Sequence, residues 1–114
     1  MRVVDLTRAL AGPYCTLLLG EMGADVIKVE RPGTGDETRQ WGPPFVDGES
    51  SYFMSVNRNK RSVTLDLKSE FGIDALRKLV CSSDVLVENF RPGTMDRLGL
   101  TYEQAHELNP GMVY

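Results

Sequence analysis

The sequence has few of the residues that build a covalent or metal-bound framework. Its 114 residues include only two cysteines and one histidine. Cys15 and Cys81 lack the CxxC spacing typical of a metal site, so we expect no metal and two reduced thiols in apolar surroundings. No apolar run approaches the roughly 20 residues of a membrane helix. Residues 1–10 lack the apolar core of a secretory signal, so we expect a cytoplasmic protein, or a mitochondrial one if a transit peptide is missing.

An excess of positive charge is also absent. The formal net charge is −3, which argues against general nucleic-acid binding. Residues 57–68 (NRNKRSVTLDLK) nevertheless carry four cations and one anion. A local basic cluster on an acidic chain suggests a focused anion site, and a solvated loop face is the alternative. The cluster comprises Arg58, Lys60, Arg61 and Lys68.

Alternating strand and helix patterns predict an α/β fold. With 41% hydrophobic and 25% charged residues, the composition suits one globular domain. Short β-branched runs predict strands, and Met112–Tyr114 resembles the first half of another. We expect the first helix to be largely buried, and the third to pack one face of Phe71, Ala75, Leu76, Leu79 and Val80. The predicted strands are 3–6, 25–30, 61–68 and 84–88, and the predicted helices are 14–22, 50–56, 70–82 and 102–108, the last opened by a Thr101–Gln104 capping box.

Two strand–helix–strand units predict a Rossmann-like parallel sheet with flanking helices. The segment Arg31–Glu49 is a long loop, and Trp41 and Phe45 within it favour order because aromatic side chains need packing partners. Because the sequence stops at the start of a buried strand, we expect an incomplete domain, with residues 1–114 forming its N-terminal part.

Cations follow several of the predicted strands. Ligands of parallel α/β sheets bind at the carboxyl ends of the strands. Arg8, Arg31, Lys68 and Arg91 lie at those ends, and the helix start near Gly12 adds backbone N–H donors. This combination fits a phosphorylated ligand, and four solvated loop residues are the alternative.

Known nucleotide and catalytic motifs are missing. Glu30 lies where an acidic residue could hold a dinucleotide ribose, but the first turn reads TRALAGP and not GxGxxG. His106 has no nucleophile nearby and is read as a surface residue. Asp36 and Glu37 could form an acid pair, although a turn role for Asp36 is favoured. No GxSxG, HExxH or P-loop occurs.

Three segments together resemble the class III CoA-transferase family (the CaiB/BaiF type). They are residues 6–39 (LTRALAGPYCTLLLGEMGADVIKVERPGTGDETR), residues 57–68 and residues 84–100 (DVLVENFRPGTMDRLGL). The resemblance runs in order from Arg2 to Tyr114. Within the family, GPPF and SSYFMSVNRNKRS are most similar to transferases of the succinate–hydroxymethylglutarate type.

The resemblance implies an enzyme that moves CoA from an acyl-CoA donor to a free carboxylic acid, with no permanently bound cofactor. It also implies interlocked homodimers and no nucleic-acid or membrane partner. The nucleophilic aspartate would lie beyond these residues, so no catalytic residue is assigned. Leu10 and Ala11 would face the thiol, although some relatives carry Gln at position 10 and leucine cannot donate that hydrogen bond. The implied CoA-binding residues are Leu10, Ala11, Arg31, Leu65, Asp66, Leu67, Lys68, Asn89, Phe90, Arg91 and Arg97.

Three other functions stay open from the sequence. The family has an α-methylacyl-CoA racemase branch, whose His/Asp acid–base pair would also lie further on. An NAD(P)-binding Rossmann fragment would place Glu30 at a ribose. A non-enzymatic interaction module is the third.

Overall fold

A computed structural model describes all residues, 1–114. None of its helices is both long enough and apolar enough to span a lipid bilayer. The elements in chain order are β1 (Arg2–Asp5), α1 (Ala11–Glu21), β2 (Asp25–Glu30), the 3-10 turn η1 (Glu37–Gln40), β3 (Phe45–Val46), β4 (Glu49–Ser50), α2 (Ser51–Asn57), β5 (Lys60–Thr64), α3 (Glu70–Cys81), β6 (Val85–Val87), α4 (Thr94–Leu98) and α5 (Tyr102–Leu108).

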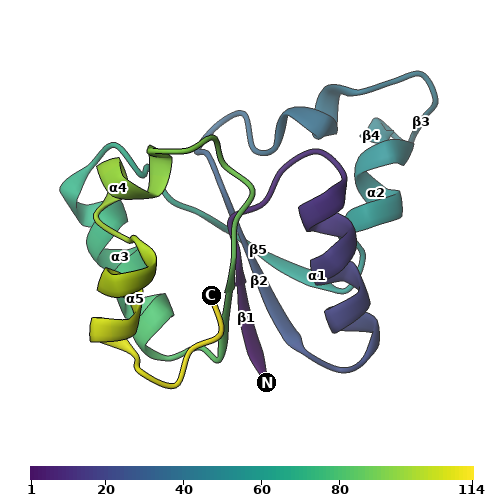
Figure 1. Cartoon of the computed structure of the whole chain (residues 1–114). Coiled ribbons are helices and arrows are strands. Elements are labelled where there is room, and N and C mark those ends of the chain that lie inside the picture. The colour runs from purple at the N-terminus through teal and green to yellow at the C-terminus, as the bar shows by residue number, and fades with distance from the viewer.

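The main sheet is parallel, with strand order β5-β2-β1-β6. Val113 forms a further parallel bridge to Val85, which begins the predicted fifth strand beside β6. Helices α1 and α2 cover one face of the sheet, and α3, α4 and α5 cover the other (Figure 1). The fold is therefore the expected α/β arrangement. Strands β2 and β5 follow in order on one side of β1, and β6 then lies on the other side of β1, so the strand order reverses between β1 and β6.

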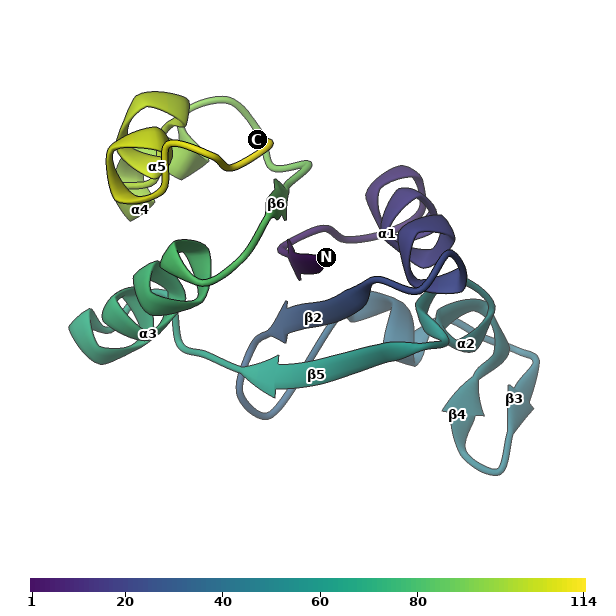
Figure 2. The same cartoon turned by 90° about the horizontal axis from the view of Figure 1, so that it is seen from below.

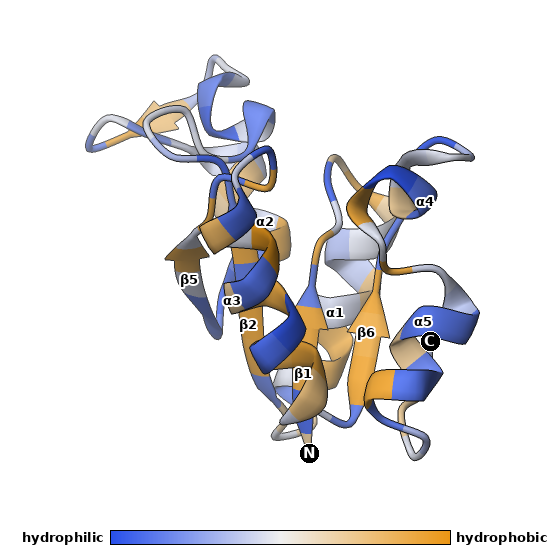
Figure 3. Cartoon of the chain, turned by 90° about the vertical axis from the view of Figure 1, so that its left-hand side faces the viewer, coloured by the Kyte–Doolittle hydropathy of each residue, from blue (hydrophilic) through white to orange (hydrophobic).

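The apolar core lies between the sheet and the α3–α5 layer. The central strands are the most hydrophobic part of the chain (Figure 3). Ser69 caps α3 and the predicted capping box opens α5, so both helices begin where the sequence places them. The buried members of this core are Val4, Leu6, Leu65, Leu76, Val80, Leu86, Met95, Leu100, Ala105 and Met112.

Three burial predictions are wrong. Helix α1 buries only Gly12, Pro13, Thr16 and Leu17, because it contacts the sheet and α2 along one side and leaves Leu18 45% exposed. Phe71 is 81% exposed because it lies in the first turn of α3, away from the core-facing stripe. Both cysteines are exposed, not enclosed by apolar side chains.

The 31–49 segment is ordered, as its aromatic residues indicated. Asp36 caps η1 by accepting a hydrogen bond from the backbone N–H of Thr38. The ring of Trp41 lies 5.0 Å from that of Tyr52. Strands β3 and β4 form a small antiparallel hairpin that projects away from the main sheet (Figure 2).

Candidate functional site

The candidate site lies along the carboxyl ends of the four parallel strands. Ligands of doubly wound sheets bind where the strand order reverses. Here that point lies between β1 and β6, whose following loops are residues 6–10 and 88–93. The β2 and β5 ends continue the same edge and contribute Arg31 and the 65–68 segment.

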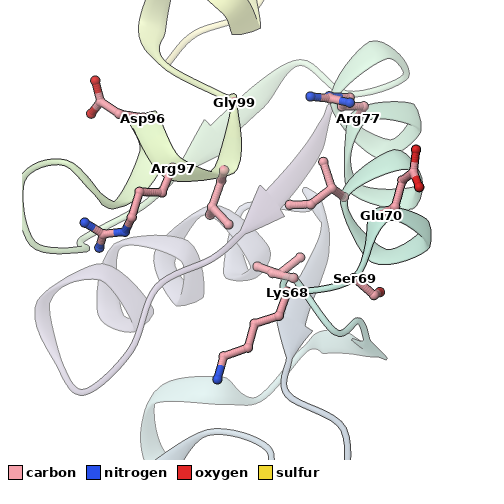
Figure 4. A pocket seen from close by; sticks show the side chains of 10 residues that line it. Lys68, Ser69, Glu70, Arg77, Asp96, Arg97 and Gly99 are labelled. Atoms are coloured by element: carbon pink, nitrogen blue, oxygen red, sulfur yellow. The ribbon is translucent and has the colours of Figure 1, made fainter.

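The larger cavity at this edge has a volume of about 640 Å³ and lies between the β5–α3 junction and α4. Lys68 and Arg97, from segments far apart in the sequence, both line it, and Figure 4 shows their charged ends pointing in different directions. Neither cation belongs to an ion pair. The lining residues are Leu67, Lys68, Ser69, Glu70, Ile73, Arg77, Asp96, Arg97, Leu98 and Gly99.

Residues 65–68 form a turn held by hydrogen bonds, so β5 ends at Thr64 and not at Lys68. Leu65 is buried in the core, so only its backbone is available to a ligand. The backbone N–H of Lys68 donates to Oδ1 of Asp66 at 3.0 Å, and Ser69 donates its N–H and its hydroxyl to the Asp66 carbonyl. The Ser69 hydroxyl in turn caps α3 by accepting from the N–H of Gly72.

Gly72 packs directly against this turn, and we expect Gly72→Ala to disturb it. A Cβ at position 72 would overlap the backbone carbonyl of Asp66, which cannot rotate away as a side chain could. We expect a loss of about 1–3 kcal/mol in the free energy of unfolding, measured by urea denaturation. Gly20→Ala is the matched control, because its added Cβ would make ordinary contacts. Equal stability of both variants would contradict the prediction.

A smaller cavity of about 210 Å³ lies beside the ends of β1 and β2. Arg31 lines this cavity together with Arg8, so the structure separates Arg31 from the Lys68–Arg97 pair. Burial and the nearby charge of Arg31 lower the pKa of Arg8. The remaining lining residues are Thr34, Gly35, Glu37 and Gln40.

The loop after β1 is held by side chains from two other segments. The amide of Asn89 accepts a hydrogen bond from the Arg8 N–H at 2.9 Å and donates one to the Arg8 carbonyl at 2.8 Å. Lys28 donates to the Thr7 carbonyl at 2.9 Å. Ala9 adopts φ +65°, a conformation that costs a residue with a Cβ about 1–2 kcal/mol. The predicted contact residue Asn89 therefore also fixes the shape of the loop.

The other predicted residues take distinct positions along this edge. Leu10 is 53% exposed, and Ala11 is the exposed first residue of α1. The ring of Phe90 lies under the Arg8 guanidinium at 5.2 Å. Arg91 is exposed and lines neither cavity.

A buried charged network supports the edge from the α1 side, and sequence reasoning missed it. Asp5 is fully buried and accepts hydrogen bonds from the N–H and hydroxyl of Thr7, from the Thr16 hydroxyl and from the Lys60 ammonium. Nζ of Lys28 lies 2.9 Å from Oδ2 of Asp36, which has no other partner. The available signal for this network was the pair of charged residues at alternate positions of β2, Lys28 and Glu30. Strand β2 has a neighbouring strand on each side, so charged side chains on it need partners within the fold.

Glu30 belongs to the same network and is not available to a ribose. Arg39 donates to both of its carboxylate oxygens at 2.7 Å, and Ser62 and the Asp36 N–H add further hydrogen bonds. Burial alone raises the pKa of Glu30, but these donors outweigh it and lower the pKa to about 2. The geometry therefore argues against the dinucleotide-binding alternative.

The basic cluster of residues 57–68 does not form one anion site. Arg58 pairs with Glu21, and Arg61 pairs with Asp25, both near the surface. Lys60 is buried against Asp5. Lys68 alone faces a cavity, because alternation along β5 and the turn after it send the four side chains in different directions.

Two other candidates have structural roles. Asp36 is buried and turn-forming, whereas Glu37 is exposed, so they are not an acid pair. His106 stacks on Tyr102 in α5, and its Nδ1 lies 3.0 Å from the Tyr102 carbonyl.

Comparisons with known proteins identify the family of the chain. The sequence model described as CoA-transferase family III matches residues 1–114. The chain therefore belongs to CoA-transferase family III. It is 52% identical over 114 residues to the succinyl-CoA:glutarate CoA-transferase of Mus musculus, covering 100% of this chain and 26% of that protein. It is 51% identical over 113 residues to the formyl-CoA:oxalate CoA-transferase of Rhodopseudomonas palustris (strain HaA2), covering 99% and 27%.

A solved structure has the same fold over the whole chain. The crystal structure of a CaiB/BaiF family protein from Brucella suis matches with a TM-score of 0.94 and 48% identity, covering 100% of this chain and 31% of that one. The chain thus spans between a quarter and a third of the length of these proteins.

Proposed function

We propose that residues 1–114 form the CoA-binding part of an enzyme that moves CoA from an acyl-CoA donor to a free carboxylic acid. The observation that carries this proposal is that Lys68 and Arg97, two cations without an ion-pair partner, line the same cavity at the carboxyl edge of the sheet. Its volume of about 640 Å³ lies within the range of ligand pockets. Family membership supports the same conclusion.

Within this proposal, the larger cavity holds the nucleotide of CoA. Lys68 acts as a point charge and Arg97 as a planar fork on the phosphates. Leu67 and the backbone of Leu65 and Asp66 border the adenine. Arg31 approaches the nucleotide from the β2 end, and Asn89, Phe90 and Arg91 line the path toward the thiol at Leu10 and Ala11.

The chemical step would use an aspartate outside these residues. An aspartyl anhydride and then an enzyme–CoA thioester would exchange one activated acyl group for another of similar energy. Asp5, Asp25 and Asp36 are held in ion pairs and are poor nucleophiles here. Residues 1–114 alone would thus bind CoA without catalysing transfer.

The acid substrate is proposed to be a short dicarboxylate. Relatives are named for glutarate, oxalate and mesaconate, all of which carry two carboxylates. An interlocked homodimer and a cytoplasmic or mitochondrial location are further parts of the proposal.

The direct test uses a polypeptide of full family length that carries residues 1–114, hereafter the full-length enzyme. It is incubated with succinyl-CoA and glutarate, and the products are separated by chromatography and mass spectrometry. We expect glutaryl-CoA and free succinate. Exchange of an α-proton without any CoA transfer would favour the racemase branch, and protection by NAD(P) but not by CoA would favour a dinucleotide-binding fragment.

The phosphate contacts are tested by Lys68→Ala and Arg97→Ala in the full-length enzyme. Each is expected to weaken CoA binding by about 1–3 kcal/mol, because each removes a charge-assisted contact. The measurement is the dissociation constant for CoA and for dephospho-CoA by calorimetry. Arg77→Ala is the matched control: Arg77 lines the same cavity, but its charge is already paired with Asp74. Equal affinity for CoA and dephospho-CoA in all variants would count against a 3′-phosphate contact.

A further inference from the structure

The backbone of the loop after β1 is held by side chains at two consecutive residues. The N–H of Thr7 donates to Oδ1 of Asp5 at 2.8 Å, and the Thr7 carbonyl accepts from Nζ of Lys28 at 2.9 Å. The amide of Asn89 binds the N–H and the carbonyl of Arg8, at 2.9 Å and 2.8 Å. All four backbone polar groups of these two residues therefore have side-chain partners. Figure 1 shows that the loops after β1 and β6 lie at the same edge of the sheet.

Packing alone does not account for the lysine in this arrangement. Lys28 belongs to an inner strand, and its side chain is only 2% exposed. Val26, two residues earlier on the same face of β2, is apolar and buried. The Lys28 ammonium is neutralised by Asp36 at 2.9 Å, but replacing such a buried pair by apolar residues is often neutral or stabilising. A charged pair at this position points to a role beyond stability.

Lys28 joins two segments that border the proposed path of CoA. Its ammonium holds the Thr7 carbonyl, which lies three residues before Leu10 and four before Ala11. The same ammonium pairs with Asp36, the residue that caps η1. One buried side chain thus connects the loop after β1 to the segment after β2.

The held loop ends in a backbone conformation that needs such support. Ala9 has φ +65°, which is unfavourable for a residue with a Cβ. Leu10 and Ala11 follow directly, and the proposed function places both at the thiol of CoA. A displacement of about 1 Å near a reacting centre can reduce a rate by about a hundredfold. The position of this loop therefore matters more for the reacting thioester than for the distant nucleotide.

We propose that Lys28 is a positioning residue for CoA transfer: by binding the Thr7 carbonyl, it fixes the backbone that presents Leu10 and Ala11 to the thioester. This role rests on the proposed function and adds a residue to the same site. Lys28 does not line the cavity of Lys68 and Arg97. Its loss should therefore slow the reaction and leave the binding of the nucleotide intact.

The test compares Lys28→Met/Asp36→Leu with the wild type in the full-length enzyme, with succinyl-CoA and glutarate as substrates. The double variant leaves no buried charge unpaired, so its fold is retained, but methionine cannot donate to the Thr7 carbonyl. We expect kcat to fall about tenfold or more. The KM for succinyl-CoA and the dissociation constant of CoA should stay within about twofold of the wild-type values.

Two further variants separate positioning from stability. Lys28→Arg restores a charge and a donor, so its kcat should lie well above that of the double variant. Val80→Ala is the stability control, because Val80 is fully buried in α3 and belongs to the core on the other face of the sheet. It should lower the unfolding midpoint and keep the wild-type kcat at a temperature where each protein is folded. If the double variant does not fold, Lys28→Gln/Asp36→Asn replaces it, since glutamine is one atom shorter than lysine.

Hydrogen exchange separates this role from the proposed function. Exchange at the backbone N–H groups of residues 6–12, followed by mass spectrometry, needs no turnover. In the double variant these groups should exchange about tenfold or more faster than in the wild type, and those of α3 should not change. If the wild type transfers no CoA, the proposed function fails, while the exchange rates still test whether Lys28 holds the loop.

Four results would overturn the role of Lys28. They are a wild-type kcat in the double variant, a loss confined to the KM for succinyl-CoA, a Lys28→Arg variant no faster than the double variant, and unchanged exchange at residues 6–12.

Discussion

Asp36→Ala is expected to lower the free energy of unfolding by about 3–5 kcal/mol, which is a large fraction of the stability of a small domain. The substitution removes the acidic partner of Lys28, whose side chain is only 2% exposed. The ammonium would then be buried with the Thr7 carbonyl as its remaining hydrogen-bond partner. Urea denaturation of the chain at neutral pH measures the loss.

Asp74→Ala provides the matched control for this experiment. Asp74 pairs with Arg77 on the surface, where such a pair contributes at most about 1 kcal/mol. The double variant Lys28→Met/Asp36→Leu should recover much of the loss, because it removes both charges together. If Asp36→Ala costs no more than Asp74→Ala, the buried pair does not stabilise the fold.

The second large effect is a loss of stability in acid that depends on Glu30. Its pKa of about 2 in the folded chain lies below the ordinary value of 4.5, so folding favours the ionised carboxylate. The stabilisation is complete above about pH 4.5 and is lost as the pH falls toward 2. A shift of this size corresponds to something on the order of 3 kcal/mol.

Glu30→Gln isolates this contribution. The pKa values of Asp25 and Asp36 are also lowered by their cationic partners, so the wild type alone would report several groups at once. The difference in unfolding free energy between wild type and Glu30→Gln should be large at pH 6 and should shrink by pH 2. A difference that stays constant over this range would show that Glu30 keeps its ordinary pKa when folded.

Local patterns located most of the elements correctly. Short β-branched runs correspond to β1, β2, β5 and β6, because alternation and branching are properties of a few neighbouring residues. The Thr101–Gln104 capping box and the Ser69 cap are contacts within one turn, so the sequence contains both partners. Element ends were less certain: β5 stops at Thr64 because the Asp66 turn follows it.

Burial was harder to predict because it depends on which elements become neighbours. The triple leucine of α1 suggested a helix covered on all sides, yet Leu18 is 45% exposed. Phe71 has an apolar side chain in an amphipathic helix, but its place in the first turn faces solvent. The composition of a segment sets how much apolar surface it has and not what will cover it.

The sequence by itself determined the α/β fold class, the parallel strand units and the family resemblance, since these depend on local patterns and ordered motifs. The tertiary structure decided which charges are neutralised. Lys60 and Asp5 pair although they are 55 residues apart, and Lys28 pairs with Asp36 across a loop. The same packing leaves Arg8, Arg31, Lys68 and Arg97 facing two cavities without acidic partners. The physical reason is that charge pairing depends on distance in space, which strand order and side-chain alternation set only once the sheet has formed.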